Sequence, residues 1–278
     1  MDKKIIFMAL VITASGCTDV LPGSTSPTSS SGSAVQIADF SINDQSLYAD
    51  QQAVITLVVE NYNSQAEITD LKLVNTGALK IQDGSWSQRC SAAELPEPVN
   101  GNPGVMECSW EVRAPPESEL GNFNSKSYSP GLMLRYRSEL SNSDRPVKIH
   151  TKEAREIEST SQVSSSFSNG EISTSIKAES PVAVGIESPV TVSIDANSQH
   201  VVSENYGFEI SPTSMIASCD GREPQNGRLS LDVAVEPSGS AQFNCVLNPQ
   251  TSTTRNLIFS TSYKYQKAPS LNVEVLSQ

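Results

Sequence analysis

Apolar and polar residues alternate with a period of two along many short segments of this 278-residue chain. In the segment QQAVITLVVEN, residues 51–61, and in ESPVTVSIDAN, residues 187–197, β-branched residues dominate the alternation. Further alternating segments lie at 71–73, 105–110, 229–235 and 271–275. Short alternating segments bounded by turn residues predict half-buried antiparallel strands. No segment offers a convincing helix of ten or more residues, so the pattern predicts an all-β fold of sandwiches.

The alternating segments fall into two blocks of similar size, in which the features follow one another in the same order. Each block has an early alternating strand, a Pro/Gly turn before a later strand, and a tyrosine-bearing strand followed by a short apolar segment. Between the blocks, residues 153–170 combine a charged run with a serine-rich stretch, which predicts an interdomain linker. We therefore expect one sandwich over residues 35–152 and a second over residues 171–278.

Each block carries two of the five cysteines, and the fifth, Cys17, precedes both blocks. Four cysteines permit three pairings. If the blocks are copies of one plan, each is bridged within itself, which selects the pairs Cys90–Cys108 and Cys219–Cys245. Bridges that close loops of this length stabilise a domain by about 3 kcal/mol on the chain-entropy model. Metal binding by these cysteines is disfavoured because the chain has no C-x-x-C motif.

The N-terminus has the parts of an export signal. Two lysines precede an apolar run at residues 5–14, and ten helical residues reach only about 15 Å, half of a hydrocarbon core. The small residues ASG at positions 14–16 stand directly before Cys17. This arrangement resembles the lipobox of prokaryotic lipoproteins. The resemblance implies that residues 1–16 are a signal peptide, and that Cys17 becomes the first mature residue and carries lipid that anchors the protein in a membrane.

The following residues and the overall charge refine the expected location. Residues 17–34 are dominated by Ser, Thr, Pro and Gly after the lipidated cysteine, which is typical of a flexible tether. The formal net charge of −12 repels phosphate backbones, so we expect no nucleic-acid partner. An exported chain meets an oxidising compartment, where disulfides persist. We therefore place the protein in the cell envelope.

Three features carry a second resemblance. They are the segment AVITLVVEN at residues 53–61, the Pro/Gly turn before a late strand, and a terminal Tyr-x-Tyr segment followed by Val-x-Val. They are similar to Ig-like modules of prokaryotic surface proteins, with the CARDB and NEW3-type modules as the nearest families. The resemblance implies two tandem Ig-like antiparallel β-sandwiches after the signal peptide and the tether.

Motifs for catalysis and metal binding are missing from the sequence. His150 and His200 have no ligand partner at metal spacing, and there is no G-x-S-x-G, H-E-x-x-H or phosphate-binding glycine loop. Acidic residues in expected turns form no calcium loop, and we interpret them as solvated: Asp44, Asp50, Asp195, Asp220 and Glu223. We therefore predict no catalytic residue, no cofactor and no metal site.

Two long polar loops, residues 90–104 and 219–227, lie beside the expected bridges. Loops held by a rigid scaffold commonly carry binding residues, so both are candidate recognition sites, and the alternative is a pair of tolerated surface insertions. Five aromatic residues are interpreted as core packing rather than as a carbohydrate platform: Trp86, Trp110, Tyr136, Tyr263 and Tyr265.

These observations together predict a non-enzymatic, lipid-anchored envelope protein that acts as a binding, adhesion or structural module. Its partners would be the membrane, through Cys17, and a protein or glycan of the envelope. A first alternative is a subunit of a secretion, pilus or surface-layer assembly that uses sheet-edge or loop contacts. A second alternative is a hydrolase with a cryptic site.

Overall fold

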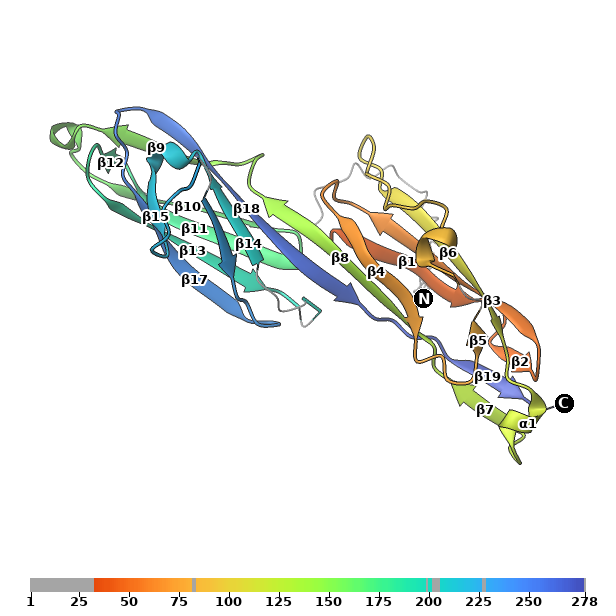
Figure 1. Cartoon of the computed structure of the whole chain (residues 1–278). Helices are drawn as coiled ribbons and strands as arrows, with labels where there is room; N and C mark the ends of the chain where they lie inside the picture. Colours follow the sequence, from red (N-terminus) through yellow and green to blue (C-terminus); the bar gives the residue numbers. More distant parts are fainter. Residues whose placement is uncertain (1–32, 82–83, 199, 202–205, 227–228, 278) are drawn as a thin grey trace, which may run out of the picture. The chain divides into compact units, whose positions relative to one another are not determined.

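The computed structural model describes residues 33–81, 84–198, 200–201, 206–226 and 229–277 (Figure 1). The predicted signal peptide, the lipidated Cys17 and the tether up to residue 32 lie outside the described residues. The regular structure of the described part is almost all strand, with only short helical turns, which confirms the predicted all-β fold. No helix among the described residues is long and apolar enough to cross a membrane.

The N-terminal part of the chain forms one four-stranded antiparallel sheet and part of two others. The four-stranded sheet has the order β1 (Val35–Ile42), β3 (Gln52–Asn61), β6 (Gly104–Arg113) and β5 (Lys80–Ile81). Strands that lie outside this sheet are β2 (Ser46–Tyr48), β4 (Glu67–Val74), β7 (Ser125–Tyr128) and β8 (Gly131–Ser141). Along β3, Ile55, Leu57 and Val59 are fully buried and the residues between them are not, as the alternation predicts.

The C-terminal part repeats this plan. A five-stranded sheet has the order β10 (Ser161–Ser168), β11 (Ile172–Ser180), β13 (Ser188–Ala196), β17 (Ser240–Leu247) and β15 (Ile216–Cys219). A second sheet has the order β12 (Val182–Ala183), β9 (Val147–Lys152), β18 (Thr254–Lys267), β14 (Tyr206–Ser211) and β16 (Leu229–Val233), and it continues through β8 to β4. The last strand is β19 (Val273–Leu276). The short helices are η1 (Trp86–Gln88), α1 (Glu117–Leu120), η2 (Ala154–Glu156) and η3 (Thr213–Met215).

Both repeats, residues 35–152 and 171–278, contain the predicted disulfide. In the first repeat η1 leads into Cys90, which is bonded to Cys108 on β6. In the second repeat η3 leads into Cys219 at the end of β15, which is bonded to Cys245 on β17. The structure thus contains the two bridges that the repeat argument selected.

The boundary between the repeats needs correction, because the final strand of each repeat pairs with the other repeat. β9 follows β8 in the first repeat, but it pairs antiparallel with the start of β18, with His150 opposite Thr254, and in parallel with β12. β19 ends the second repeat, but it pairs antiparallel with β7, with Val273 opposite Tyr128, and in parallel with β2. The repeats therefore exchange equivalent strands, and residues 35–152 and 171–278 are not two self-contained sandwiches.

The predicted linker at residues 153–170 is also wrong in part. Residues 161–168 form β10, which pairs with β11 over its whole length. Serine-rich composition favours a linker, but β10 alternates Val163 and Phe167 with polar residues and packs both against the core from the edge of a sheet. All described residues belong to one contact unit.

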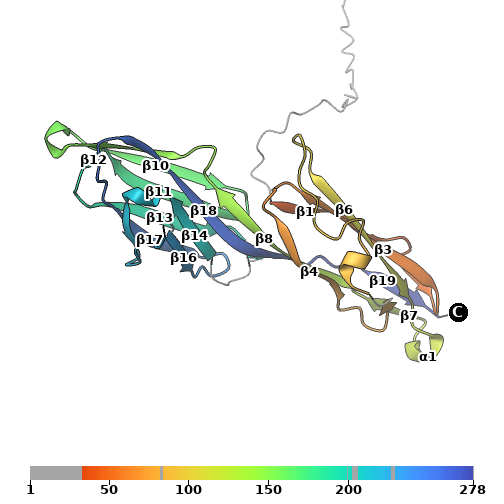
Figure 2. The ribbon, with the colours of Figure 1, turned by 45° about the horizontal axis from the view of Figure 1, so that its top comes forward.

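The long strands β8 and β18 join the two repeats. They pair antiparallel from Ser141 opposite Ser260 to Leu134 opposite Lys267, and they lie side by side in Figures 1 and 2. Their tyrosines fill the interior, since Tyr136 is fully buried and its ring centroid lies 5.5 Å from that of Tyr265. The long pairing explains why the final strands are carried across to the other repeat.

A buried carboxylate sits beside these tyrosines. Glu171, in the turn between β10 and β11, is fully buried. Its Oε1 accepts a hydrogen bond from the backbone N–H of Ala34 at 2.9 Å and another from the Tyr136 hydroxyl, and its Oε2 accepts one from the Tyr263 hydroxyl at 2.5 Å. Burial raises the pKa of the Glu171 carboxyl group and also the pKa values of both tyrosines. This cluster ties the start of β1, the turn and the two long strands together.

Candidate ligand-binding site

A pocket of about 380 Å³ lies beside the loop at residues 90–104. Three segments form its walls, namely the β3–β4 connection with the start of β4, the short helix η1, and the loop. The lining residues are Ser64, Ala66, Glu67, Ile68, Trp86, Ala93, Glu94, Leu95 and Glu97. The structure therefore gives one of the two candidate recognition loops a concave surface.

The base of this loop is fixed by covalent and backbone bonds. Cys90 is bonded to Cys108, and just beyond it the backbone N–H of Ser91 donates to the carbonyl oxygen of Glu107 at 2.7 Å. The N–H of Glu107 donates in return to the Ser91 hydroxyl at 3.1 Å. The start of the loop thus pairs with β6 through backbone hydrogen bonds over a short length.

The middle of the loop is fixed by burial and close packing. The fully buried Asn61 donates from Nδ2 to the carbonyl oxygen of Pro96 at 2.8 Å, and Leu95 is buried in the core. Gly104 packs under the same carbonyl, because a Cβ placed there would lie 2.0 Å from the Pro96 oxygen. Any side chain at Gly104 would push the loop outward. The part of the pocket wall that carries Glu94 and Glu97 is therefore preformed.

The pocket combines negative charge with an apolar and aromatic surface. Glu67, Glu94 and Glu97 are exposed at its rim, and its lining contains no lysine or arginine. Trp86 is half-buried and is part of the pocket lining. Carboxylates at a rim concentrate cations, and an indole face attracts an ammonium or guanidinium group within about 6 Å. The arrangement suits a cationic side chain with an aliphatic stem.

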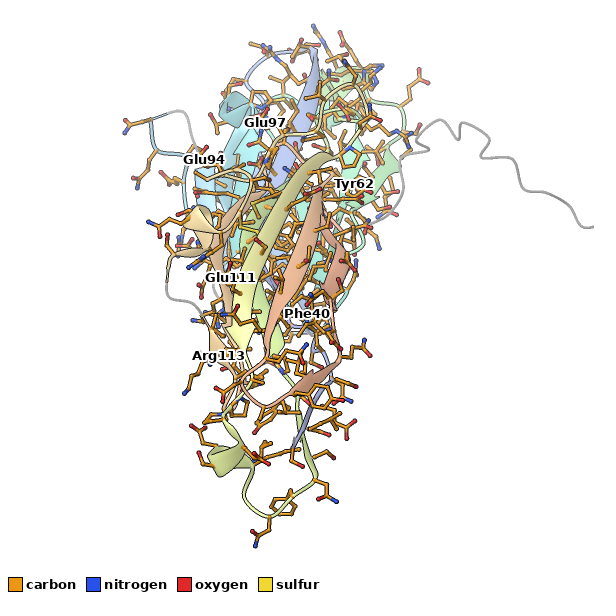
Figure 3. The ribbon with its side chains drawn as sticks, turned by 90° about the vertical axis from the view of Figure 1, so that its right-hand side faces the viewer. Phe40, Tyr62, Glu94, Glu97, Glu111 and Arg113 are labelled. Carbon is orange, nitrogen blue, oxygen red and sulfur yellow. A yellow bond between two sulfur atoms is a disulfide. The ribbon has the colours of Figure 1, made fainter. Side chains whose placement is uncertain are left out.

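The sheet face next to the pocket extends this negative charge. On β6, Glu107 and Glu111 point outward, and on β3 Glu60 accepts a hydrogen bond from the exposed Tyr62 hydroxyl at 2.6 Å. The hydrogen bond to Glu60 raises the pKa of Tyr62. Figure 3 shows Glu94 and Glu97 at one end of this face and Glu111 farther along β6.

The second candidate loop is built differently. The backbones of Cys219 and Arg222 exchange hydrogen bonds at 2.8 and 2.9 Å, so Asp220 and Gly221 form a two-residue turn. Both turn residues have positive φ, 47° and 75°, which is the left-handed backbone that tight hairpin turns require. Over its described part, residues 219–226, this loop is a compact hairpin end rather than a wall of the pocket.

The other residues singled out in the sequence take structural positions. His150 contacts the Thr254 hydroxyl through Nδ1 at 2.9 Å, whereas His200 lies near the Tyr265 ring. The aromatic residues pack in or against the core, as predicted. Trp86 is half-buried, packs against the core and also lines the pocket, and the other four are buried: Trp110, Tyr136, Tyr263 and Tyr265.

The acidic turn residues make local contacts. Asp50 forms an ion pair with Arg113 at 3.1 Å, and Asp44 accepts a hydrogen bond from the backbone of Ser46 at 3.0 Å. Within the described residues, no group of three His, Cys, Asp or Glu side chains is placed to hold a metal ion.

Comparison with known proteins gives no family. No protein-family model matches the chain, and no curated protein matches it. Among solved structures, red sea bream transglutaminase is 11% identical with a TM-score of 0.21, covering 88% of this chain and 31% of its own. Dimeric latent PorU from Porphyromonas gingivalis is 10% identical with a TM-score of 0.21, covering 93% of this chain and 21% of its own.

The collagen adhesin of S. aureus is 9% identical with a TM-score of 0.15, covering 87% of this chain and 92% of its own. The chain therefore spans only 31% and 21% of the lengths of the first two proteins. Similarities at these TM-scores carry no information about what this chain binds, so the case for a function rests on its own pocket.

Proposed function

We propose that this chain is a non-enzymatic binding module of the cell envelope, anchored through lipid on Cys17, which binds a lysine- or arginine-bearing segment of a protein partner. The observation that carries the proposal is the pocket, whose lining combines Glu67, Glu94 and Glu97 with the half-buried Trp86. The two disulfides support an exported location, because such bridges persist in oxidising compartments.

The binding mechanism is attraction followed by insertion into a preformed site. The net charge of −12 attracts a basic segment toward the module. Salt screens this attraction beyond about 10 Å at an ionic strength of 0.1 M. An aliphatic stem then packs on Ala66, Ile68 and Leu95, while its charged end meets the rim carboxylates. The loop is already held by Cys90–Cys108 and by Asn61, so little ordering entropy opposes binding.

The test is a calorimetric titration with a hexalysine peptide, with a hexaglutamate peptide as the comparison. We expect hexalysine alone to bind, and more weakly as the salt concentration rises. The double variant E94Q/E97Q removes two rim charges and should weaken binding by about threefold to tenfold. The matched control is E107Q/E111Q, which removes two charges from β6 outside the pocket lining.

The comparison of the two double variants distinguishes binding at the pocket from non-specific attraction by the overall negative charge. The proposal requires E94Q/E97Q to weaken hexalysine binding clearly more than E107Q/E111Q does. Equal losses would show that overall charge, and not the pocket, attracts the peptide. Absence of hexalysine binding at low salt would overturn the proposal.

A further inference from the structure

The strand β10 forms an open edge of the five-stranded sheet. It comes first in the strand order, and among the described strands it pairs with β11 alone (Figure 2). Its sequence, SQVSSSFS, has no charged residue and no proline, and its eight residues pair with β11 without a bulge. By contrast, β1 and β4, which are edge strands of equal length, are both interrupted by bulges. Natural proteins protect edges with bulges, charges or proline, and β10 has none of these.

The hydrogen bond at the turn between β10 and β11 shows which backbone N–H and C=O groups of β10 face the open side. The N–H of Asn169 donates to the carbonyl oxygen of Ile172, so these two residues form a hydrogen-bonded pair. Such pairs alternate along an antiparallel ladder, so the odd-numbered residues of β10 bond to β11. The even-numbered residues direct N–H and C=O groups to the open side: Gln162, Ser164, Ser166 and Ser168. Their side chains are exposed on the outer face of the sheet.

We propose that β10 is a self-association edge, which pairs antiparallel with β10 of a second copy of this chain about a two-fold axis at Ser165. This register sets Gln162 opposite Ser168 and Ser164 opposite Ser166 of the other copy. All four outward-facing residues then lie in hydrogen-bonded pairs, and the two sheets become one continuous sheet.

The same register also matches the side chains. It places Val163 of each copy directly opposite Phe167 of the other copy. Ser165 then lies opposite Ser165 of the other copy. Val163 and Phe167 are half-buried against the core, and cross-strand apolar pairs stabilise a sheet. Shifting the axis by one residue, to Ser164 or Ser166, still aligns outward-facing residues but breaks the Val163–Phe167 pairing. The backbone pattern therefore permits axes at Ser164, Ser165 and Ser166, and the pairing of Val163 with Phe167 selects the axis at Ser165.

The self-matching register of β10 argues for a second copy as the occupant, and the lack of charge on β10 permits that contact. Each copy carries a net charge of −12, so two copies repel wherever acidic faces approach. β10 presents an uncharged strand through which two acidic chains can meet. A basic partner strand would gain nothing from the serine side chains of β10, whereas it would be attracted to the acidic pocket.

Cysteine cross-linking of the full chain in intact cells tests the register. The variants S164C, S165C and S166C are each exposed to a mild oxidant and examined on non-reducing gels. Residues directly opposite in a non-hydrogen-bonded pair have Cα atoms about 4.5 Å apart, which lies within the range that a disulfide spans. We expect S165C to form the most disulfide-linked dimer. Strongest linkage at position 164 or 166, or linkage of S165C to a different protein, would overturn the proposal.

A proline at the edge tests whether the backbone pairs. The N–H of Ser164 points outward, so S164P leaves the bonds to β11 in place and removes one bond to each copy. In the S165C background, S164P should lower the dimer yield by about tenfold, and S164A, which keeps the N–H, should leave it unchanged. Equal yields from S164P and S164A would contradict pairing through the backbone, and equal melting temperatures of the two variants show that the fold is intact.

Discussion

Truncation of Val275 tests the exchange of strands between the repeats. Val275 is fully buried on β19, where it lies opposite Leu47 of β2 and Lys126 of β7. The substitution V275A removes two buried carbon groups, each worth about 0.8 kcal/mol, and leaves a cavity that adds to the loss. We expect the free energy of unfolding to fall by about 2–3 kcal/mol, which lowers the melting temperature by about 4–12 °C.

Hydrogen exchange measured by mass spectrometry locates the damage. In V275A, amide protection should fall in β2 and β7, which are more than 140 residues away in sequence, and should persist in β13 and β17. The matched control is V192A, a fully buried valine of β13, whose loss should instead expose β11 and β17. If V275A lowers protection only in strands of the second repeat, the repeats are self-contained and the exchange is refuted.

Three further substitutions test other parts of the structure. Because burial raises the pKa of Glu171, its carboxyl group holds a proton more tightly in the folded chain than in the unfolded one. The free energy of unfolding should therefore fall as pH rises from about 4.5 through the folded-state pKa. Urea unfolding of E171Q should lack that fall, and a pH profile of E171Q equal to that of the unchanged protein would contradict the prediction. The variant G104A forces a Cβ against the Pro96 carbonyl, so the free energy of unfolding measured by thermal denaturation should fall by about 1–3 kcal/mol. Hexalysine should also bind more weakly to G104A, and unchanged binding would show that the position of the loop does not affect the pocket. Finally, C17S should release the protein from membranes with the fold intact, and a signal-cleaved variant that stays membrane-bound would contradict the lipid anchor.

The sequence predicted the strands well because burial on one face imposes a period of two. The central strands β3 and β13 lie within the two segments with the clearest alternation. The disulfide pairing followed from the repeat, since each block carries two of the four cysteines and copies of one plan are bridged within themselves. Local pattern and internal repetition therefore carried most of the secondary structure.

The exchange of β9 and β19 could not be predicted from the same pattern. Alternation shows that residues 147–152 and 273–276 are buried on one side, but both repeats offer an equivalent edge for each strand. The choice depends on how far β8 and β18 extend along one another. That length is a property of tertiary packing, which leaves no local signal in composition.

The candidate site was predicted only in outline. The loop at residues 90–104 was singled out for its length and its bridge. Trp86 was assigned to the core, against which it packs, but its place in the pocket lining was not predicted. The pocket itself was not predicted, because the β3–β4 connection, η1 and the loop that form it are brought together only by tertiary packing. Glu171 was missed because an acidic residue in a polar turn is ordinarily solvated, and its burial depends on tyrosines 35 and 92 residues away.

The central claim is that the pocket receives a basic segment of a protein partner. The most direct measurement is photo-cross-linking in intact cells from a reactive side chain placed at position 97, with position 111 on β6 as the control. We predict a product specific to position 97 whose cross-linked peptide, sequenced by mass spectrometry, contains lysine or arginine, and whose yield falls in an E94Q background. Equal products from both positions, a captured peptide without a basic residue, or no product at position 97 would contradict the account.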